Sequence, residues 1–243
     1  MIYQKDEKIS FYDLDANGDV KLSALLRHIN EAAFYNAEEL GIGFEKTLKI
    51  DLAFIIQRIG LRIFKMPVLK QKVVIRTWPG EITRSAFKRY GAICNEEGNK
   101  LIEWESLWVL INVNERRIKR PNTFPIEIAP YGKKGVEIET RKIVLPKEKE
   151  LNTSYKHTVQ FSELDINMHM NNAIYGDLIA NVLALNTALP SVKAWKDVQF
   201  NYVNEAKLSD EVVVNCYQSN DSLYITGNIE EKTIFTAAIR YGE

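Results

Sequence analysis

An acid, an amide and an imidazole alternate along one short segment of this chain. Asp165, Asn167 and His169 are separated by single apolar residues, and the segment comes immediately before a helical pattern. In an extended segment, residues two apart face the same way, so we expect these three side chains to converge. Free N–H groups at the start of the following helix favour negative charge nearby. A base, an orienting polar group and donors for an oxyanion are what hydrolysis by acyl transfer requires.

A purely structural interpretation of this segment is also open, because its polar residues could cap the helix while His169 is solvated. An earlier segment argues for chemistry. Residues 11–17 match residues 161–167 without gaps, at an offset of 150 residues, but Asp19 occupies the position of His169. Capping alone would tolerate this difference, whereas a catalytic site can be kept in one copy and lost in the other.

The elements around the two copies repeat as well. Residues 22–40 and 173–189 have apolar residues at helical spacing, and each stretch is followed by several strand-like runs. Internal repetition of this kind indicates a duplication. One helix on an antiparallel sheet buries only one face of each, so two such units side by side could share a core. The sequence therefore predicts an α+β fold of two tandem hotdog domains, each a long helix wrapped by an antiparallel sheet, which form a pseudo-dimer in one chain.

The strand-like runs and the segment between the halves define the predicted domains. The runs cover residues 52–64, 72–78, 85–95 and 101–113, then 153–161, 192–203, 211–217, 223–229 and 233–241. Residues 8–12 are also strand-like. A polar, proline-bearing stretch without a sustained period follows the first set of runs. We predict an N-terminal domain over residues 1–130, a linker over 131–150 and a C-terminal domain over 151–243.

The earlier of the two matching segments, from Asp13 onward, begins like a calcium-binding loop. Oxygen-bearing residues occupy the first, third and fifth positions from Asp13, and Gly18 occupies the sixth. The twelfth position is Ala24, where a bidentate Glu belongs, and no helical pattern precedes the loop. A polar turn that leads into a helix is the better interpretation. The sequence predicts no metal site and no cofactor.

Composition limits the remaining classes of function. Lys plus Arg and Asp plus Glu are both 32, so there is no overall basic footprint for nucleic acid. The chain has no apolar run of about 18 residues that would span a membrane, and its N-terminus lacks the apolar run of a signal peptide. Cys94 and Cys216 form no CxxC motif or Cys/His cluster, which argues against a disulfide framework. We expect a cytoplasmic monomer or homodimer that binds neither nucleic acid nor membranes.

The pattern D-x-N-x-H-x-N-N-x-x-Y over residues 165–175 resembles the loop of hotdog-fold thioesterases. The duplicated layout resembles, more narrowly, the acyl-ACP thioesterase family of plants and bacteria. Residues 108–112, followed by Arg116 and Arg117, are similar to that family's W-V-x-x-N…R-R segment. Residues 200–205 are similar to the segment that supplies a catalytic glutamate.

The resemblance implies hydrolysis of the thioester between a fatty acyl chain and acyl carrier protein (ACP), in fatty acid biosynthesis, with the acyl chain bound by the N-terminal domain. Position by position, the family's catalytic residues fall on Asp165, Asn167, His169 and Glu205. Plant members have Cys directly after the glutamate, where this chain has Ala206. Water activated by His169 and Glu205 is therefore favoured over a thiol nucleophile, and either group could take the proton. Asn167 would position the thioester or the water, and Asp165 would orient its neighbours.

The sequence also contains a candidate docking surface and is compatible with two alternative functions. ACP is acidic, so Arg116, Arg117, Lys119 and Arg120 form a candidate docking surface, with a solvated linker as the alternative. An acyl-CoA thioesterase is the nearest alternative function, because related loops occur more widely among hotdog enzymes. A non-catalytic acyl-binding hotdog module is the alternative from another class.

The other two histidines are interpreted as packing or surface residues. His28 lies in the middle of the first helical pattern, beside Arg27. His157 lies in a strand-like run with no acidic partner recognised nearby in sequence. Neither is predicted to take part in the chemistry.

Overall fold

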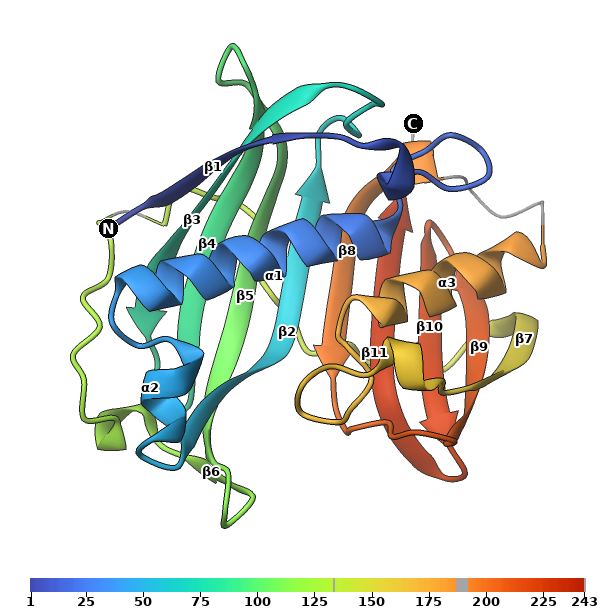
Figure 1. Ribbon diagram of the computed structural model, residues 1–243. Helices are drawn as coiled ribbons and strands as arrows, with labels where there is room; N and C mark the ends of the chain where they lie inside the picture. The colour runs from blue at the N-terminus through green and yellow to red at the C-terminus, as the bar shows by residue number, and fades with distance from the viewer. Residues whose placement is uncertain (133, 187–191, 243) are drawn as a thin grey trace. The chain divides into compact units, whose positions relative to one another are not determined.

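The computed structural model divides into two compact units, and it describes residues 1–132, 134–186 and 192–242. Unit 1 contains Met1–Ile9 and His28–Thr140, and unit 2 contains Ser10–Arg27 and Arg141–Glu243. In each unit a helix lies against antiparallel strands (Figure 1). This architecture confirms the predicted α+β fold of hotdog type.

Unit 1 has a sheet of antiparallel strands that a helix crosses. Its strands are β1 (Tyr3–Lys8), β2 (Leu52–Ile63), β3 (Lys72–Ile82), β4 (Phe87–Asn95), β5 (Lys100–Asn112) and β6 (Arg117–Lys119). They are ordered β1-β3-β4-β5-β2, and β6 pairs with β5. Its helices are the part of α1 (Leu22–Glu39) from His28 onward, α2 (Phe44–Leu48) and the 3-10 helix η2 (Pro121–Thr123).

The helical pattern of residues 22–40 is observed as α1, which ends at Glu39, shortly before a glycine. Gly41 has φ +73°, a left-handed conformation that a glycine adopts without steric cost. The N–H of Ile42 then donates to the carbonyl oxygen of Ala37 at 3.0 Å, which satisfies a free carbonyl at the helix end. The chain turns here, and Ile42 enters a buried cluster at this end of unit 1.

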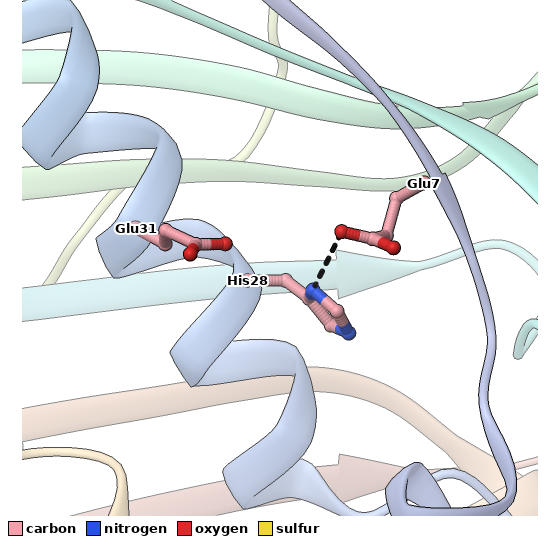
Figure 2. A group of neighbouring side chains, drawn as sticks. All are labelled: Glu7, His28 and Glu31. Atoms are coloured by element: carbon pink, nitrogen blue, oxygen red, sulfur yellow. Dashed lines mark ion pairs between the residues drawn. The ribbon is translucent and has the colours of Figure 1, made fainter.

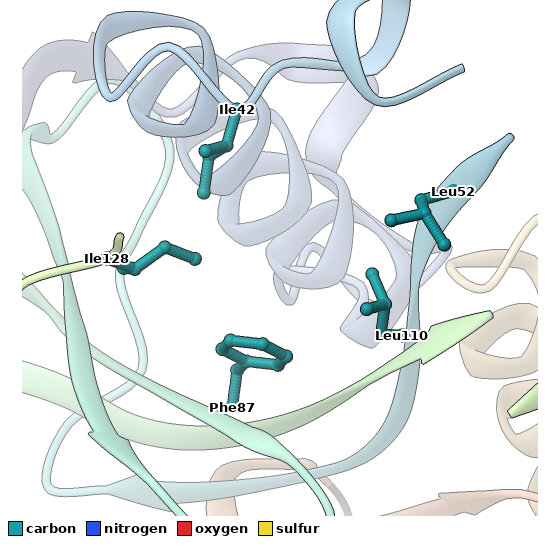
Figure 3. Close-up of a cluster of buried hydrophobic side chains, with 5 residues drawn as sticks. All are labelled: Ile42, Leu52, Phe87, Leu110 and Ile128. Atoms are coloured by element: carbon teal, nitrogen blue, oxygen red, sulfur yellow. The ribbon is translucent and has the colours of Figure 1, made fainter. Parts of the chain in front are cut away.

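That cluster joins separate elements of unit 1 through apolar side chains. Figure 3 shows its buried members, Ile42, Leu52, Phe87, Leu110 and Ile128. They come from the α1–α2 connection, from β2, β4 and β5, and from the chain after η2. Burial of side chains of this size contributes about 1.5–3 kcal/mol each. The cluster therefore fixes the strand ends and the chain after η2 to one another.

A segment without helix or strand, residues 134–140, is fixed to unit 1 by two buried carboxylates of β5. Glu103 Oε1 accepts the N–H groups of Glu137 at 2.7 Å and of Ile138 at 3.1 Å. Glu105 Oε1 accepts the N–H of Thr140 at 3.0 Å and its hydroxyl at 2.8 Å. Acceptors buried in this way are stable because each is hydrogen-bonded. This segment lies within residues 131–150, the range predicted as a linker, and no helix or strand occurs in the described residues of that range before Glu150.

Unit 2 repeats the plan. Its strands are β7 (Glu150–Thr158), β8 (Trp195–Tyr202), β9 (Glu211–Ser219), β10 (Ser222–Ile229) and β11 (Lys232–Tyr241), in the order β8-β11-β10-β9-β7. Its helices are α3 (Ile174–Ala184) and the 3-10 helices η1 (Phe11–Asp13), η3 (Phe161–Glu163) and η4 (Val192–Ala194). Figure 1 shows α3 lying across the strands of this unit.

Within unit 2, α3 closely approaches the first turn of α1 at a glycine. A Cβ on Gly176 would lie 2.7 Å from the backbone nitrogen of Ser23, so a side chain does not fit there. The carboxylate of Asp177 accepts a hydrogen bond from the Ser23 hydroxyl and forms an ion pair with Arg27 at 3.2 Å. These contacts fix the start of α3.

Local structure differs from the prediction at several boundaries. Residues 8–12 are not a strand, because β1 ends at Lys8 and η1 begins at Phe11. The predicted strand 192–203 begins with η4, and β8 starts at Trp195. The predicted helix 173–189 is observed as α3 up to Ala184, and residues 187–189 lie outside the described residues. Among the described residues, no helix is both long and apolar enough to cross a membrane.

Candidate active site

The segment with the alternating acid, amide and imidazole is a closed turn, so the predicted extended conformation is wrong. The N–H of Asp165 donates to the carbonyl oxygen of His169 at 2.9 Å, and the N–H of Met168 donates to that of Asp165 at 3.0 Å. The side chain of Asp165 accepts the N–H of Asn167 at 2.8 Å. Aspartate favours turns because its carboxylate can bond the backbone two residues on. Met168 adopts φ +62°, the left-handed conformation that closes the turn.

Glu205 is placed by the backbone on both sides of it. After β8, the N–H groups of Val203 and Asn204 both donate to the carbonyl oxygen of Ile234 on β11, at 2.8 and 3.0 Å. Directly after Glu205, the carbonyl oxygen of Ala206 accepts the N–H of Met170 at 2.8 Å. Because Met170 follows His169 and Ala206 follows Glu205, this backbone bond brings the two side chains together.

His169 and Glu205 are in direct contact in unit 2. Nε2 of His169 lies 2.9 Å from Oε2 of Glu205, and the two side chains are 24% and 39% exposed. This exposure leaves the pair in contact with solvent. An imidazole hydrogen-bonded to a carboxylate has one ring nitrogen oriented by its partner and the other left for a proton-transfer role. The arrangement can activate a water molecule at the protein surface.

The other two predicted catalytic residues occupy the same turn without joining this pair. Asp165 is engaged with the backbone of the turn, as described above. Asn167 is exposed, and its side-chain amide has no hydrogen bond to the described residues. The structure therefore brings together His169 and Glu205, engages the Asp165 side chain in the turn, and leaves Asn167 exposed.

Aromatic residues surround the start of α3. Tyr175 is buried and makes edge contacts with Phe235 and Tyr202, with ring centroids 4.8 and 5.6 Å apart. The hydroxyl of Tyr202 donates to the carbonyl oxygen of Asn172 at 3.3 Å. Burial first, and then the negative charge of Glu205, raises the pKa of Tyr175 above its ordinary value. The phenol therefore stays neutral, and the aromatic contacts hold the chain between the turn and α3.

His157 corrects the sequence interpretation, which recognised no acidic partner. Its Nε2 lies 2.8 Å from Oε2 of Glu163, in η3. The acid is six residues further along, where a strand leads into a turn. The spacing of six residues across a strand-to-turn boundary could have revealed this acidic partner. Where the chain changes direction, residues before and after the bend come close together.

A group in unit 1 has the geometry to be considered as a metal site. Figure 2 shows Glu7, on β1, facing His28 and Glu31 of α1, and one ligand atom from each residue lies within 4.8 Å of the others. The ammonium of Lys5 already pairs with Glu7 at 2.8 Å and with Glu31 at 2.6 Å. Hydrogen bonds to Glu31 and Glu7 raise the pKa of Lys5. The group fits an ion-pair cluster whose cation is Lys5.

The two cysteines are buried and form no disulfide, as predicted. Burial raises the pKa of Cys216 to about 11 and also raises that of Cys94. A nucleophilic cysteine needs a lowered thiol pKa, so both side chains have the opposite of the required chemistry. Ala206 is itself fully buried.

The predicted docking residues lie on and after the β5–β6 hairpin of unit 1. Arg116 has φ +53° in the turn, and Arg117 begins β6 with an exposed side chain. Lys119 forms an ion pair with Glu115 at 2.8 Å. The hairpin therefore presents arginine side chains to solvent, while Lys119 is partly neutralised.

Arg120 belongs to a pocket that the sequence did not predict. The pocket has a volume of about 330 Å³ and is lined by Ile82, Thr83, Arg84, Arg120, Pro121 and Asn122. Arg84 lies between β3 and β4, far from Arg120 in sequence. No local pattern connects the two arginines, because β-sheet packing brings them together.

Comparison with solved structures supports the hotdog architecture. The chain matches the crystal structure of an acyl-ACP thioesterase from Bacteroides thetaiotaomicron with a TM-score of 0.85, at 20% identity, over 99% of this chain and 98% of that one. It matches the 12:0-ACP thioesterase from Umbellularia californica with a TM-score of 0.82, at 18% identity, over 99% of this chain and 97% of that one. Both are similar to this chain in fold.

Family models identify the chain. Residues 1–123 match the model of the acyl-ACP thioesterase N-terminal domain, and residues 146–242 match that of the C-terminal domain. The chain belongs to the acyl-ACP thioesterase family, which confirms the resemblance seen in the sequence.

Relatives from plants agree with this assignment. The chain is 25% identical over 188 residues to the chloroplastic acyl-[acyl-carrier-protein] hydrolase FATB2 of Cuphea viscosissima, covering 72% of this chain and 45% of that protein. It is 26% identical over 194 residues to the chloroplastic dodecanoyl-[acyl-carrier-protein] hydrolase of Cinnamomum camphora, covering 74% and 50%. The chain thus spans about half the length of the curated relatives it matches.

Proposed function

We propose that this protein hydrolyses the thioester of fatty acyl-ACP to a free fatty acid and holo-ACP. Membership of the acyl-ACP thioesterase family and the names of its relatives support this substrate class. The observation that carries the proposal is the 2.9 Å contact between Nε2 of His169 and Oε2 of Glu205. This pair is a base oriented by a second group and open to solvent, as activation of water requires.

In the proposed reaction, water attacks the thioester carbon while the His169–Glu205 pair accepts the proton of the water. A C–O bond forms, and the carbonyl oxygen becomes an oxyanion. When the tetrahedral intermediate collapses, the C–S bond breaks and the pantetheine sulfur leaves. The proton held by the pair returns to that sulfur, so the products are the fatty acid and the free thiol of ACP.

Asn167 and Asp165 have supporting roles in this proposal. The amide of Asn167 is exposed beside His169 in sequence, where it can donate to the thioester oxygen or to the water. A well-placed donor to a developing oxyanion typically contributes about 10²–10³ in rate. Asp165 holds the turn through its bond to the N–H of Asn167 at 2.8 Å and thereby orients both neighbours.

Turnover of matched substrates tests the function. Purified protein is given acyl-ACP and acyl-CoA with the same acyl chain, and release of free thiol is measured. We expect a higher kcat/KM for acyl-ACP. Preference for acyl-CoA would identify an acyl-CoA thioesterase instead, and tight binding without thiol release would identify an acyl-binding module. His169→Ala serves as the catalytic control in each assay.

We further propose that the acidic carrier docks on the basic hairpin formed by Arg116, Arg117, Lys119 and Arg120. Positive charge on the hairpin and the pocket shared by Arg120 and Arg84 supports this location. Charges at the rim of an interface mainly govern association rate and salt dependence. The pantetheine thioester is common to acyl-ACP and acyl-CoA, so selectivity for ACP requires contacts of this kind.

Charge reversal tests the docking surface. Arg117→Glu with Arg120→Glu should raise KM for acyl-ACP about tenfold and flatten its salt dependence, while hydrolysis of a short acyl-pantetheine analogue is unchanged. Lys46→Glu with Lys49→Glu, on and just after α2, makes the same change in net charge and is the matched control. Equal losses with both substrates would show that the hairpin is structural, and no loss would place the carrier elsewhere.

We also propose, from the sequence, which domain binds the acyl chain, where the protein acts and how it assembles. The N-terminal domain, residues 1–130, binds the acyl chain in this proposal, and the protein acts in the cytoplasm as a monomer or homodimer. Cross-linking with a photoreactive acyl chain on ACP, followed by peptide mapping, tests the first point. Labelled peptides confined to the C-terminal domain would contradict it.

A further inference from the structure

The ion pair between His157 and Glu163 has no part in the proposed chemistry, but it lies at the base of the catalytic turn. His157 belongs to β7, and Glu163 ends η3, just before the turn. Their nitrogen and oxygen are 2.8 Å apart, and the side chains are only 19% and 18% exposed. A partly buried, charge-assisted contact of this length is stronger than a typical surface ion pair.

Glu163 connects β7 to both arms of the turn. Its Oε2, the atom that pairs with His157, also accepts the N–H of Gln160 at 2.8 Å. Its carbonyl oxygen accepts the N–H of Asn171 at 2.9 Å, which closes the loop from 163 to 171 at its base. The position of His169 within this loop therefore depends on where Glu163 is held.

The same end of β7 also holds the segment that carries Glu205. The N–H of Val159 donates to the carbonyl oxygen of Asp210 at 2.9 Å, and the N–H of Ser209 donates to that of Val159 at 3.0 Å. One strand end thus anchors the catalytic turn through His157 and the Glu205 segment through Val159. Both anchors therefore act on the register between His169 and Glu205, together with the backbone bond from Met170 to Ala206.

The first copy of the fold keeps only one of these two anchors. There the N–H of Ile9 donates to the carbonyl oxygen of Gln71 at 3.0 Å, which corresponds to the bond made by Val159. The position of His157 is occupied by Glu7, at the same offset of 150 residues, and Glu7 pairs with Lys5 at 2.8 Å. The position of Glu163 is occupied by Asp13, another acid, so these two side chains cannot attract each other.

We propose that His157 is a positioning residue, which acts through Glu163 to hold His169 in register with Glu205. This proposal rests on the proposed function, because it assigns His169 and Glu205 to the reaction. In the copy that has His169, His157 on β7 pairs with Glu163 before the turn. In the copy that has Asp19 instead, the two corresponding positions carry the acids Glu7 and Asp13. Loss of register by a fraction of an ångström lowers kcat while leaving the binding of the acyl carrier intact.

The test compares His157→Ala and His157→Gln with Glu7→Ala as the matched control from the first copy. We expect His157→Ala to lower kcat for acyl-ACP roughly tenfold, with KM changed by less than about twofold. His157→Gln, which can still donate to Glu163, should recover most of the loss. Glu7→Ala should leave kcat unchanged. If His157→Ala does not fold, Glu163→Gln weakens the same contact while it keeps an acceptor for Gln160.

A second measurement separates this proposal from the proposed function. The imidazole NMR signals of His169 at fixed pH should shift in His157→Ala and not in Glu7→Ala, whether or not the protein is active on the chosen substrate. A wild-type protein without thioesterase activity would overturn the proposed function alone. Unchanged kcat and unchanged His169 signals in a folded His157→Ala, with His169→Ala inactive, would overturn the positioning role alone.

Discussion

The two copies of the polar turn have the same backbone frame. The N–H of the aspartate donates to the carbonyl oxygen four residues on, from Asp15 to Asp19 at 2.8 Å and from Asp165 to His169 at 2.9 Å. In both copies the aspartate carboxylate also accepts the N–H two residues on, at 2.8 Å. The frame is therefore independent of the histidine.

What differs is the side chain presented by the frame. In the first copy, Asp19 forms an ion pair with Lys193 at 3.0 Å. In the second copy, His169 occupies that position and pairs with Glu205 at 2.9 Å. The comparison teaches that the shared aspartate is explained by the turn itself. The histidine and glutamate are not required by the turn and are the residues that a reaction would need.

The largest expected effect tests whether chemistry is confined to one copy. His169→Ala should lower kcat about 10²-fold or more, in line with the loss of a general base. Asp19→Ala, at the same position of the other frame, should leave kcat nearly unchanged. Steady-state kinetics with acyl-ACP measures both variants, and equal losses would show that the copies share the chemistry.

A smaller effect sharpens the division between frame and chemistry. Asp15→Ala and Asp165→Ala remove the same bond to the backbone, so each should destabilise the protein by about 1 kcal/mol. Only Asp165→Ala should also lower kcat, by roughly tenfold, because the turn it loosens carries His169. Denaturant unfolding and steady-state kinetics measure the two quantities. An Asp165→Ala variant with full activity would remove Asp165 from the proposed site.

The left-handed residue of the frame allows a further comparison. This residue is Gly18 in the first copy, with φ +78°, and Met168 in the second, with φ +62°. A residue with a Cβ is strained there by about 1–2 kcal/mol, while glycine loses more entropy on folding. Met168→Gly should therefore stabilise the protein slightly, by about 0.5 kcal/mol. A clear loss of stability in thermal unfolding would mean that the Met168 side chain makes contacts that the first copy lacks.

The smallest effect concerns the thiol of Cys216, in unit 2. Because the pKa of Cys216 is raised to about 11, the thiol is protonated below that pH, and at pH 8 only about one molecule in a thousand carries a thiolate. Cys216→Ala should change kcat by less than about twofold, and iodoacetamide at pH 8 should leave activity intact. Mass spectrometry that found an acyl group on Cys216 would restore a thiol mechanism.

The sequence predicted what depends on local patterns. The first helix and most strands follow from spacing, turn residues and conformational preference, and the duplication follows from residues 11–17 and 161–167. Strand β1 was missed, because its sequence YQKDEK has no apolar face. It pairs with β3, at the end of the unit 1 strand order. Polar strands of this kind are common at sheet edges.

The residues of the candidate site were proposed from the sequence, but their arrangement was not. Glu205 was assigned through resemblance alone, because its approach to His169 depends on the backbone bond from Met170 to Ala206 at 2.8 Å. The turn was predicted as extended, since alternating residue types do not distinguish a strand from an aspartate-closed turn. The pairing of His157 with Glu163 depends on the angle between β7 and η3, which single-residue patterns do not contain.

Ala206 provides a way to observe the site in motion. It is fully buried, and its carbonyl oxygen is bonded to Met170 beside the histidine. In a protein with Cys94 and Cys216 replaced by Ala, the substitution Ala206→Cys would put one thiol inside this contact. Its rate of reaction with a thiol reagent would report how often the segment opens, because a buried group is labelled only in the open state. Turnover measured on the same sample would then show whether opening accompanies each catalytic cycle.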